Sequence, residues 1–320
     1  MKNKILIGAL LMIFVLAFSS SSVWAGSLTL VTNTTTAQDA ISGLGNNCAI
    51  TFDPNGNYSN FSATLRANAS NVALNGNGAN LTGTGISGSH VLTIDGVNKI
   101  TIRDFNINCA GQNGIRGNNT LAVTIINCTF TNGSAAINLF GASSGFNITG
   151  NTITNMKVGN GNGISVVHHG TNGLTDVSES YITNNKISNV NFGMFIGGNF
   201  KGYITGNNIS SASQYGIQFV GRQAATNGVV NVTMTNNYIN STGIGLALDT
   251  PQFNYLNLNN NTIAGTNACV EIGSSPSVNF VNLIVTNNKF WGGLGNLQLL
   301  YNKSSSWGLN WFNGVVVPPF

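Results

Sequence analysis

The phrase Tyr181-Ile-Thr-Asn-Asn-Lys-Ile187 recurs along this chain, and it decides the fold. Close variants occupy 203–209, 233–239, 256–263 and 284–290, and looser copies end at Ile107, Phe130 and Ile153. A fixed phrase that returns at intervals of about 25 residues is the sequence signature of a solenoid, in which each repeat packs only against its neighbours. The repeat therefore predicts a stack of similar coils.

Each copy of the repeat has two halves, and both predict short strands. The first half is an apolar-x-apolar segment followed by Asn or Gly, then Asn, then an anchoring Ile or Phe. The second halves are Gly114-Ile115, Ala136-Ile137, Gly163-Ile164, Gly193-Met194, Gly216-Ile217, Gly245-Leu246, Cys269-Val270 and Asn296-Leu297. These segments are too short for helices, their side chains alternate inward and outward, and turn residues separate them.

A coil of about 22–24 residues with three short strands predicts an all-β fold, a single-stranded right-handed parallel β-helix of about ten coils. Leucine-rich repeats have a similar period. They are excluded because the chain lacks leucine phasing and lacks helical stretches between the predicted strands.

An asparagine stands two residues before the anchoring Ile or Phe in most copies of the phrase. These residues are Asn151, Asn185, Asn207, Asn237, Asn261 and Asn288. Stacked coils would place their amides above one another, where they hydrogen-bond along the axis as an asparagine ladder. Earlier coils have Phe105 and Cys128 at this position, so we expect the ladder to end there.

The two ends of the chain differ from the repeat. Residues 1–25 have the basic, apolar and small-residue regions of a secretory signal peptide. Residues 26–48 are expected to form an N-terminal cap, with a helix over Thr34–Leu44 and Thr35 or Thr36 as its N-cap. The β-helix is expected over 49–301, and an aromatic C-terminal cap over 302–320. The aromatic residues at this end are Trp291, Trp307, Trp311, Phe312 and Phe320, and a sugar-stacking patch is the alternative interpretation.

The composition narrows the classes of partner. Charged residues are 6% of the chain, whereas 42% are apolar and periodic, which is not a disordered composition. The net charge of +4 falls to 4 − 2 = +2 when Lys2 and Lys4 leave with the signal peptide. Because the chain has no basic stripe, we expect no nucleic-acid partner. No later stretch is apolar enough to span a membrane, so the mature chain is expected to be extracellular.

Four cysteines, Cys48, Cys109, Cys128 and Cys269, are too dispersed for a zinc pattern. Secretion permits disulfides, and Cys109 and Cys128 are about one coil apart. A neighbouring pair and two small buried apolar residues are both compatible with this spacing.

The repeats resemble the right-handed parallel β-helix, or pectate-lyase-like, superfamily over residues 49–300. The segments 71–79 and 92–102 resemble the usual opening coils of that superfamily. The Asn-rich, charge-poor texture is similar to adhesin-like surface β-helix proteins of methanogenic archaea. The resemblance implies the fold and leaves the function open, because this fold carries lyases, hydrolases, epimerases and non-catalytic binding proteins.

Two coils are longer than the others and predict a binding trough. The extra residues fall at 168–176 and 221–227, and the coil between them has no insertion. Two loops on either side of one coil would border a trough about 10 Å wide, which is twice the coil spacing. The residues expected to line this trough are Asp176, Phe195, Asn199, Phe200 and Gln218. Neutral surface loops are the alternative interpretation.

Catalytic chemistry is sparse in this region. The candidates for acid–base chemistry are Lys201, Arg222, His168 and His169. The candidates for a Ca²⁺ site, which only a lyase would need, are Asp176, Glu179 and Asp249. β-Helix polygalacturonases, which this chain resembles in fold, have Asp directly before Gly-Ile-type strands. Here those positions are Asn113, Ala135, Asn162, Phe192 and Tyr215, which argues against that mechanism.

The sequence therefore predicts a secreted or cell-surface β-helix protein that is non-catalytic and adhesin-like. Its expected partner is a polysaccharide or a cell-surface glycan, and the chain is expected to be a monomer without a cofactor. One alternative is a lyase or epimerase that acts on a uronate-containing polysaccharide in the trough. The other is a structural spacer module.

Overall fold

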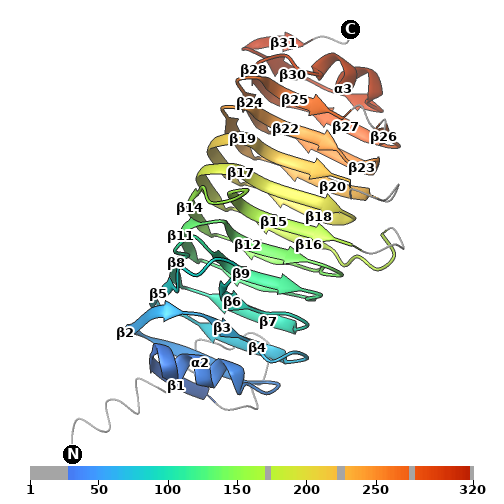
Figure 1. Ribbon diagram of the computed structural model, residues 1–320. Coiled ribbons are helices and arrows are strands. Elements are labelled where there is room, and N and C mark those ends of the chain that lie inside the picture. Colours follow the sequence, from blue (N-terminus) through green and yellow to red (C-terminus); the bar gives the residue numbers. More distant parts are fainter. Residues whose placement is uncertain (1–27, 170–173, 222–227, 274–277, 318–320) are drawn as a thin grey trace, which may run out of the picture.

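The computed structural model describes residues 28–169, 174–221, 228–273 and 278–317. They form a parallel β-solenoid of about 11 turns with two short helices, as predicted (Figure 1). Successive coils pair in parallel, so the phrase at Tyr181 lies directly below its copy at Tyr203. The predicted signal peptide lies outside the described residues.

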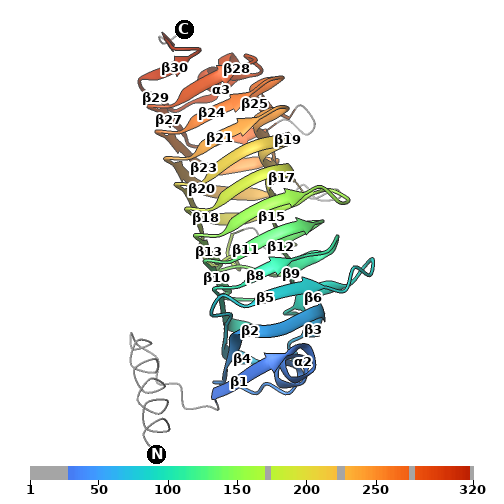
Figure 2. The same cartoon turned by 90° about the vertical axis from the view of Figure 1, so that its left-hand side faces the viewer.

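Each regular coil contributes a strand segment to each of three faces, and Figure 2 shows the stack turned by 90°. The first face holds β1 (Leu28–Asn33), the start of β2 (Ala49–Phe61), β4 (Ser70–Asn75), β7 (Asn98–Arg103), β10 (Thr124–Ile126), β13 (Asn147–Thr149), β16 (Ser180–Thr183), β18 (Phe200–Thr205), β20 (Val229–Thr235), β23 (Gln252–Asn259), β26 (Asn279–Phe280), β27 (Leu283–Thr286) and β29 (Ser306–Trp307).

The second face holds the end of β2, β5 (Asn80–Gly83), β8 (Asn106–Asn108), β11 (Thr129–Gly133), β14 (Thr152–Met156), the first parts of β17 (Lys186–Gly198) and β19 (Asn208–Val220), β21 (Tyr238–Ser241), β24 (Thr262–Gly265), β28 (Lys289–Gly292) and β30 (Asn310–Phe312). The third face holds β3 (Ala63–Thr64), β6 (His90–Thr93), β9 (Asn113–Asn118), β12 (Ala135–Phe140), β15 (Asn162–His168), the second parts of β17 and β19, β22 (Ile244–Asp249) and β25 (Ala268–Ile272).

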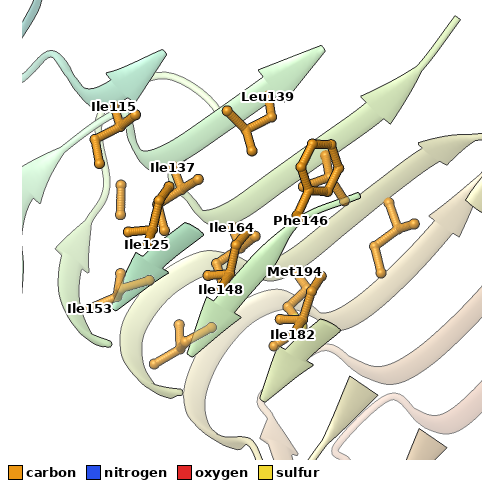
Figure 3. Packing of buried hydrophobic residues seen from close by; sticks show 14 of the residues in the cluster. Ile115, Ile125, Ile137, Leu139, Phe146, Ile148, Ile153, Ile164, Ile182 and Met194 are labelled. Atoms are coloured by element: carbon orange, nitrogen blue, oxygen red, sulfur yellow. The ribbon is translucent and has the colours of Figure 1, made fainter. Parts of the chain in front are cut away.

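The interior is a set of apolar columns that follow the axis. Ile115, Ile137, Ile164 and Met194 are register partners on the third face, and Ile125 is the register partner of Ile148 on the first (Figure 3). These side chains are fully buried. Burial of such side chains drives the stacking, because a single coil cannot cover its own apolar face.

The corner between the first and second faces explains the repeated Asn-Asn and Gly-Asn pairs. The first member of the pair adopts a left-handed conformation, with φ of 55° at Asn184, 58° at Asn236 and 65° at Gly206. Asparagine and glycine tolerate that conformation better than other residues. The second member is therefore free to turn its side chain inward.

The predicted asparagine ladder is present, and each of its members is at most 2% exposed. Asn207 is typical: its Nδ2 donates to Asn237 Oδ1 at 3.0 Å and to the Ile182 carbonyl at 2.8 Å, and its backbone N–H donates to the same Oδ1 at 3.0 Å. The ladder stops at Cys128, whose N–H donates to Asn151 Oδ1.

The ladder continues one residue further than predicted, because Asn288 Nδ2 donates to Asn310 Oδ1 at 3.1 Å. Asn310 also stands two residues before an aromatic anchor, Phe312, and β30 pairs in parallel with β28. The coils therefore run beyond residue 301, into the segment where the sequence suggests an aromatic cap. Trp307 and Phe312 pack against the core, and Phe320 lies outside the described residues.

Two helices lie at the ends of the stack. The N-terminal helix α2 (Thr34–Ser42) has Asn33 as its N-cap, two residues before the earlier of the two expected caps, and Asn33 Oδ1 accepts from the Thr36 N–H at 3.0 Å. Asparagine is among the best N-cap residues. The C-terminal helix α3 (Leu297–Lys303) is followed by β29 and by the antiparallel pair of β30 with β31 (Val315–Val317). Within the described part of the chain, no helix is long and apolar enough to cross a membrane.

The four cysteines are free thiols. Cys109 and Cys128 lie at different corners, because Cys128 accompanies Phe105 in register whereas the Cys109 N–H donates to the Thr131 carbonyl. Burial raises the pKa of each of these two thiols to about 12. They behave as small apolar residues of the core.

We expect Asn237→Ala to lower the free energy of unfolding by about 3 kcal/mol, because it removes the Oδ1 acceptor of the buried Asn207 N–H and Nδ2 and the Nδ2 donor to the Ile204 carbonyl. The exposed neighbour Asn208 supplies the control, and Asn208→Ala should change stability by less than about 0.5 kcal/mol. Urea unfolding of the three proteins measures both values. Equal stability of the two variants would show that the ladder adds nothing.

Candidate functional site

The third face carries a group of outward-facing aromatic side chains, Phe192, Phe195 and Tyr215, which we call the aromatic cluster. Phe192 and Tyr215 are register partners on β17 and β19. Their rings stack at 5.4 Å between centroids with 21° between planes. The Phe195 ring lies 6.1 Å from Phe192 and is turned by 84°, so it stands outside the stack. All three side chains are partly exposed.

Phe195 is partly exposed and is not stacked on another aromatic ring. Its register partners on the neighbouring coils are Ser165 and Gln218, neither of which is aromatic. Aromatic rings with one uncovered face are the groups that stack on the apolar faces of sugars and other flat ligands.

Polar groups follow the aromatic cluster toward the C-terminal coils. Gln218 Nε2 donates to Asp249 Oδ2 at 2.9 Å. Glu271 lies on the next coil, because its register partner is Ala247, two residues before Asp249. The two carboxylates are therefore diagonal neighbours at the outer surface of β22 and β25.

Partial burial and neighbouring charges raise the pKa values of Asp249, Glu271 and Tyr215. Partial burial is the main cause for Asp249, and the hydrogen bond from Gln218 opposes it. Partial burial also raises the pKa of Glu271, and the charge of Asp249 adds to that effect. The pKa of Tyr215 is raised by burial and then by the charges of Glu271 and Asp249. These three side chains therefore act on one another electrostatically.

The N-terminal coils of the third face have a different character. Arg116 forms an ion pair with Asp95, and its guanidinium lies 4.7 Å from the centroid of the Phe140 ring. Burial and the Arg116 charge lower the pKa of His90. The cations of this region already have partners on the face itself.

Three long connections begin at the corner after the third face. β15 ends at His168, β19 ends at Val220, and β25 ends at Ile272. His168 pairs with Gly198 and Val220 pairs with Gly197, so the first two connections leave the same corner two levels apart, with the shorter connection of β17 between them. The third connection was not predicted, although the 20 residues from Val270 to Phe290 exceed the usual spacing.

Among the described residues, only some of the side chains that were predicted to line the trough lie at the surface. Phe195 and Gln218 face outward on the third face. Asn199 and Phe200 are 2% and 3% exposed, so they cannot line an open trough. Asn199 Oδ1 instead accepts from the Val229 N–H at 3.0 Å, which fixes the corner. Asp176 is exposed beyond the end of β15.

The predicted acid–base residues do not meet at one point. His168 is 5% exposed, and burial lowers its pKa, followed by the charge of the partly exposed His169. Lys201 is a register partner of Asn231 on the first face, and so it does not lie at the floor of a trough on the third face. Arg222 lies outside the described residues.

The predicted metal ligands are separated in the same way. Glu179 accepts from the Tyr181 hydroxyl beside the first face, whereas Asp249 is held by Gln218 on the third. Among the described residues, no group of three or more His, Cys, Asp or Glu side chains could hold a metal ion.

In the sequence, Phe192 and Tyr215 are notable only as positions that lack an acid. The usable signal was that two consecutive coils have an aromatic residue directly before the glycine of the second half-repeat. Residues at the same position of successive coils stack, so the two rings had to become neighbours.

The raised pKa of Asp249 makes its ionised form less favourable in the folded state than its ordinary pKa of 3.8 implies. This cost is absent below the ordinary pKa and fully present above the raised one. Asp249→Asn should therefore gain more stability relative to wild type at pH 7 than at pH 3. Urea unfolding at both pH values measures the difference, with the exposed Asp39→Asn as control. A pH-independent difference for Asp249→Asn would contradict the expectation.

Comparison with known proteins places this geometry in a family. The family model described as right handed beta helix region matches residues 69–229. Among solved structures, a mutant tailspike protein of E. coli bacteriophage HK620 in complex with a hexasaccharide has a TM-score of 0.56 and 10% identity, with 89% of this chain and 58% of that chain covered. The Streptococcus pneumoniae surface protein and adhesin PfbA has a TM-score of 0.56 and 15% identity, with 83% of each chain covered.

The chain spans about half the length of the tailspike chains it matches, 50% in the first of them. No curated protein matches it significantly. Identities this low show a shared fold and no more, but the family model covers half of the chain and agrees with the stacked parallel coils. The chain belongs to the right-handed β-helix family.

Proposed function

We propose that this protein is an extracellular, adhesin-like β-helix that binds a glycan chain along its third face. The observation that carries the proposal is the aromatic cluster, which leaves Phe195 outside the ring stack. Gln218, Asp249 and Glu271 follow it along the axis and offer hydrogen-bonding groups for sugar hydroxyls. Apolar faces and hydroxyl edges are the two features that a sugar presents together.

The structural neighbours support this proposal in outline. One neighbour was solved with a hexasaccharide and another is named as a surface adhesin. Both share the solenoid fold with this chain over most of its length. The leader-like residues 1–25 support secretion.

Binding is favoured over the uronate lyase or epimerase alternative. Lys201, one of the candidates for acid–base chemistry, is on the first face, and the described residues hold no cluster suited to Ca²⁺.

Phe195→Ala should weaken binding to an immobilised glycan ligand at least about tenfold, because the substitution removes the ring that stacks on the sugar. Tyr203→Ala is the matched control, since Tyr203 is a 39% exposed aromatic residue on the first face. A glycan array identifies the ligand with wild-type protein, and biolayer interferometry measures the variants. Equal losses in the two variants, or no glycan bound by the wild type, would refute the proposal.

A second candidate function is glycoside hydrolysis by Asp249 and Glu271. The observation that favours it is that these two carboxyl groups lie on adjacent coils at the outer surface of one face, since glycoside hydrolysis uses a pair of carboxyl groups. Hydrolysis would release new reducing ends from the bound glycan. Asp249→Asn and Glu271→Gln should each lower that rate at least about 100-fold. Binding without new reducing ends would leave the non-catalytic function alone.

A further inference from the structure

The charges on the third face give the proposed glycan site a selectivity. On β19, β22 and β25, which follow the aromatic cluster along the axis, the charged side chains are Asp249 and Glu271. Both lie on the outward side of their strands. A glycan that runs from Phe195 along the axis would therefore pass two negative charges within two or three coil spacings, about 10–15 Å.

The two carboxylates already repel each other. The charge of Asp249 is one of the two causes that raise the pKa of Glu271, and the charges of both raise the pKa of Tyr215. A third negative charge on the ligand would add to this repulsion in a partly dehydrated place, where screening by salt is weaker than in open water.

Among the described residues near this part of the third face, the side chains that could donate to an anion already have other partners. The Nε2 group of Gln218 donates to Asp249. Lys157, at the edge near Phe192, has its Nζ 3.1 Å from the Val190 carbonyl and 3.5 Å from Asn191 Oδ1. Arg116, three coils earlier, is paired with Asp95. Carboxylate oxygens accept hydrogen bonds only, and sugar hydroxyls supply the donors that they require.

Resting on the glycan-binding function proposed above, we propose that the third face selects uncharged pyranose chains and rejects polyuronates, with Asp249 and Glu271 as the selectivity-determining residues. The lyase alternative requires the opposite class of ligand, a uronate-containing polysaccharide. The proposal needs no new pocket, because it concerns only which chains the aromatic cluster accepts.

The test uses the full secreted chain and pairs of glycans that differ only in charge. Each pair is a polyuronate oligosaccharide, such as oligogalacturonate or oligomannuronate, and its methyl-esterified form. The array also carries neutral glucans, galactans and mannans. Binding is compared between wild type and the Asp249→Asn/Glu271→Gln double variant at low and physiological ionic strength. Circular dichroism and urea unfolding show that the variant is folded.

Wild type should bind the neutral member of a recognised pair at least about tenfold more tightly than the charged member. In the double variant, the affinities for the two members should differ by no more than about threefold, because the polyuronate binds more tightly than it does to wild type. Higher salt should lower the ratio of the wild-type affinities for the neutral and charged members, because the Debye length falls to about 8 Å at physiological ionic strength.

The results separate this inference from the function on which it rests. If wild type binds polyuronates as tightly as their esters, or if the ratio is the same in the double variant, the selectivity is wrong and glycan binding still stands. If neither protein binds any glycan on the array, the proposed function fails and the selectivity fails with it. Wild type could also bind only uncharged glycans that belong to no pair. In that case, a polyuronate signal that is the same in the double variant as in wild type overturns the role of the two carboxylates.

Discussion

Every other feature of this molecule depends on hydrogen bonds that run parallel to the solenoid axis and hold the coils in register. Each coil pairs with the next on three faces, so no coil satisfies its backbone alone. The asparagine ladder extends this pairing to a corner, where the chain turns and backbone pairing would lapse. From Asn151 to Asn310 each amide joins two coils, and every buried donor and acceptor of an interior member has a partner.

Register has a direct consequence for the surface. Because residues at equivalent positions stack, the outside of the solenoid is a set of columns, and any departure from Asn, Thr or Ser in neighbouring coils creates a local cluster. Phe192 and Tyr215 became a ring stack in this way, and Gln218 and Glu271 stand in the column that contains Phe195. The same rule that builds the scaffold therefore assembles the candidate site.

The sequence was sufficient for the fold class, for six of the ladder asparagines and for the end of the ladder at Cys128, because a short-range phrase repeated in register determines them. It was insufficient where the side-chain direction depends on the neighbouring coil. Asn199 and Phe200 occupy a segment that predicts exposure, yet the corner turns them inward. Lys201 is two residues from Asn199, but the chain has already turned onto the first face. The N-cap is Asn33 instead of Thr35 or Thr36, because Asn33 forms a capping box with Thr36.

By itself, the sequence determined the coil, its period, the inward columns and the poverty of charge, since all of these follow from the spacing of residue types along the chain. Only the tertiary structure decided which outward residues share a face. It also decided that Phe195 lies outside the Phe192–Tyr215 stack and that Asp249 and Glu271 are diagonal neighbours. The reason is geometric. Residues more than twenty positions apart come together through the register and the corner between coils, and a difference of two residues at a corner moves a side chain to another face.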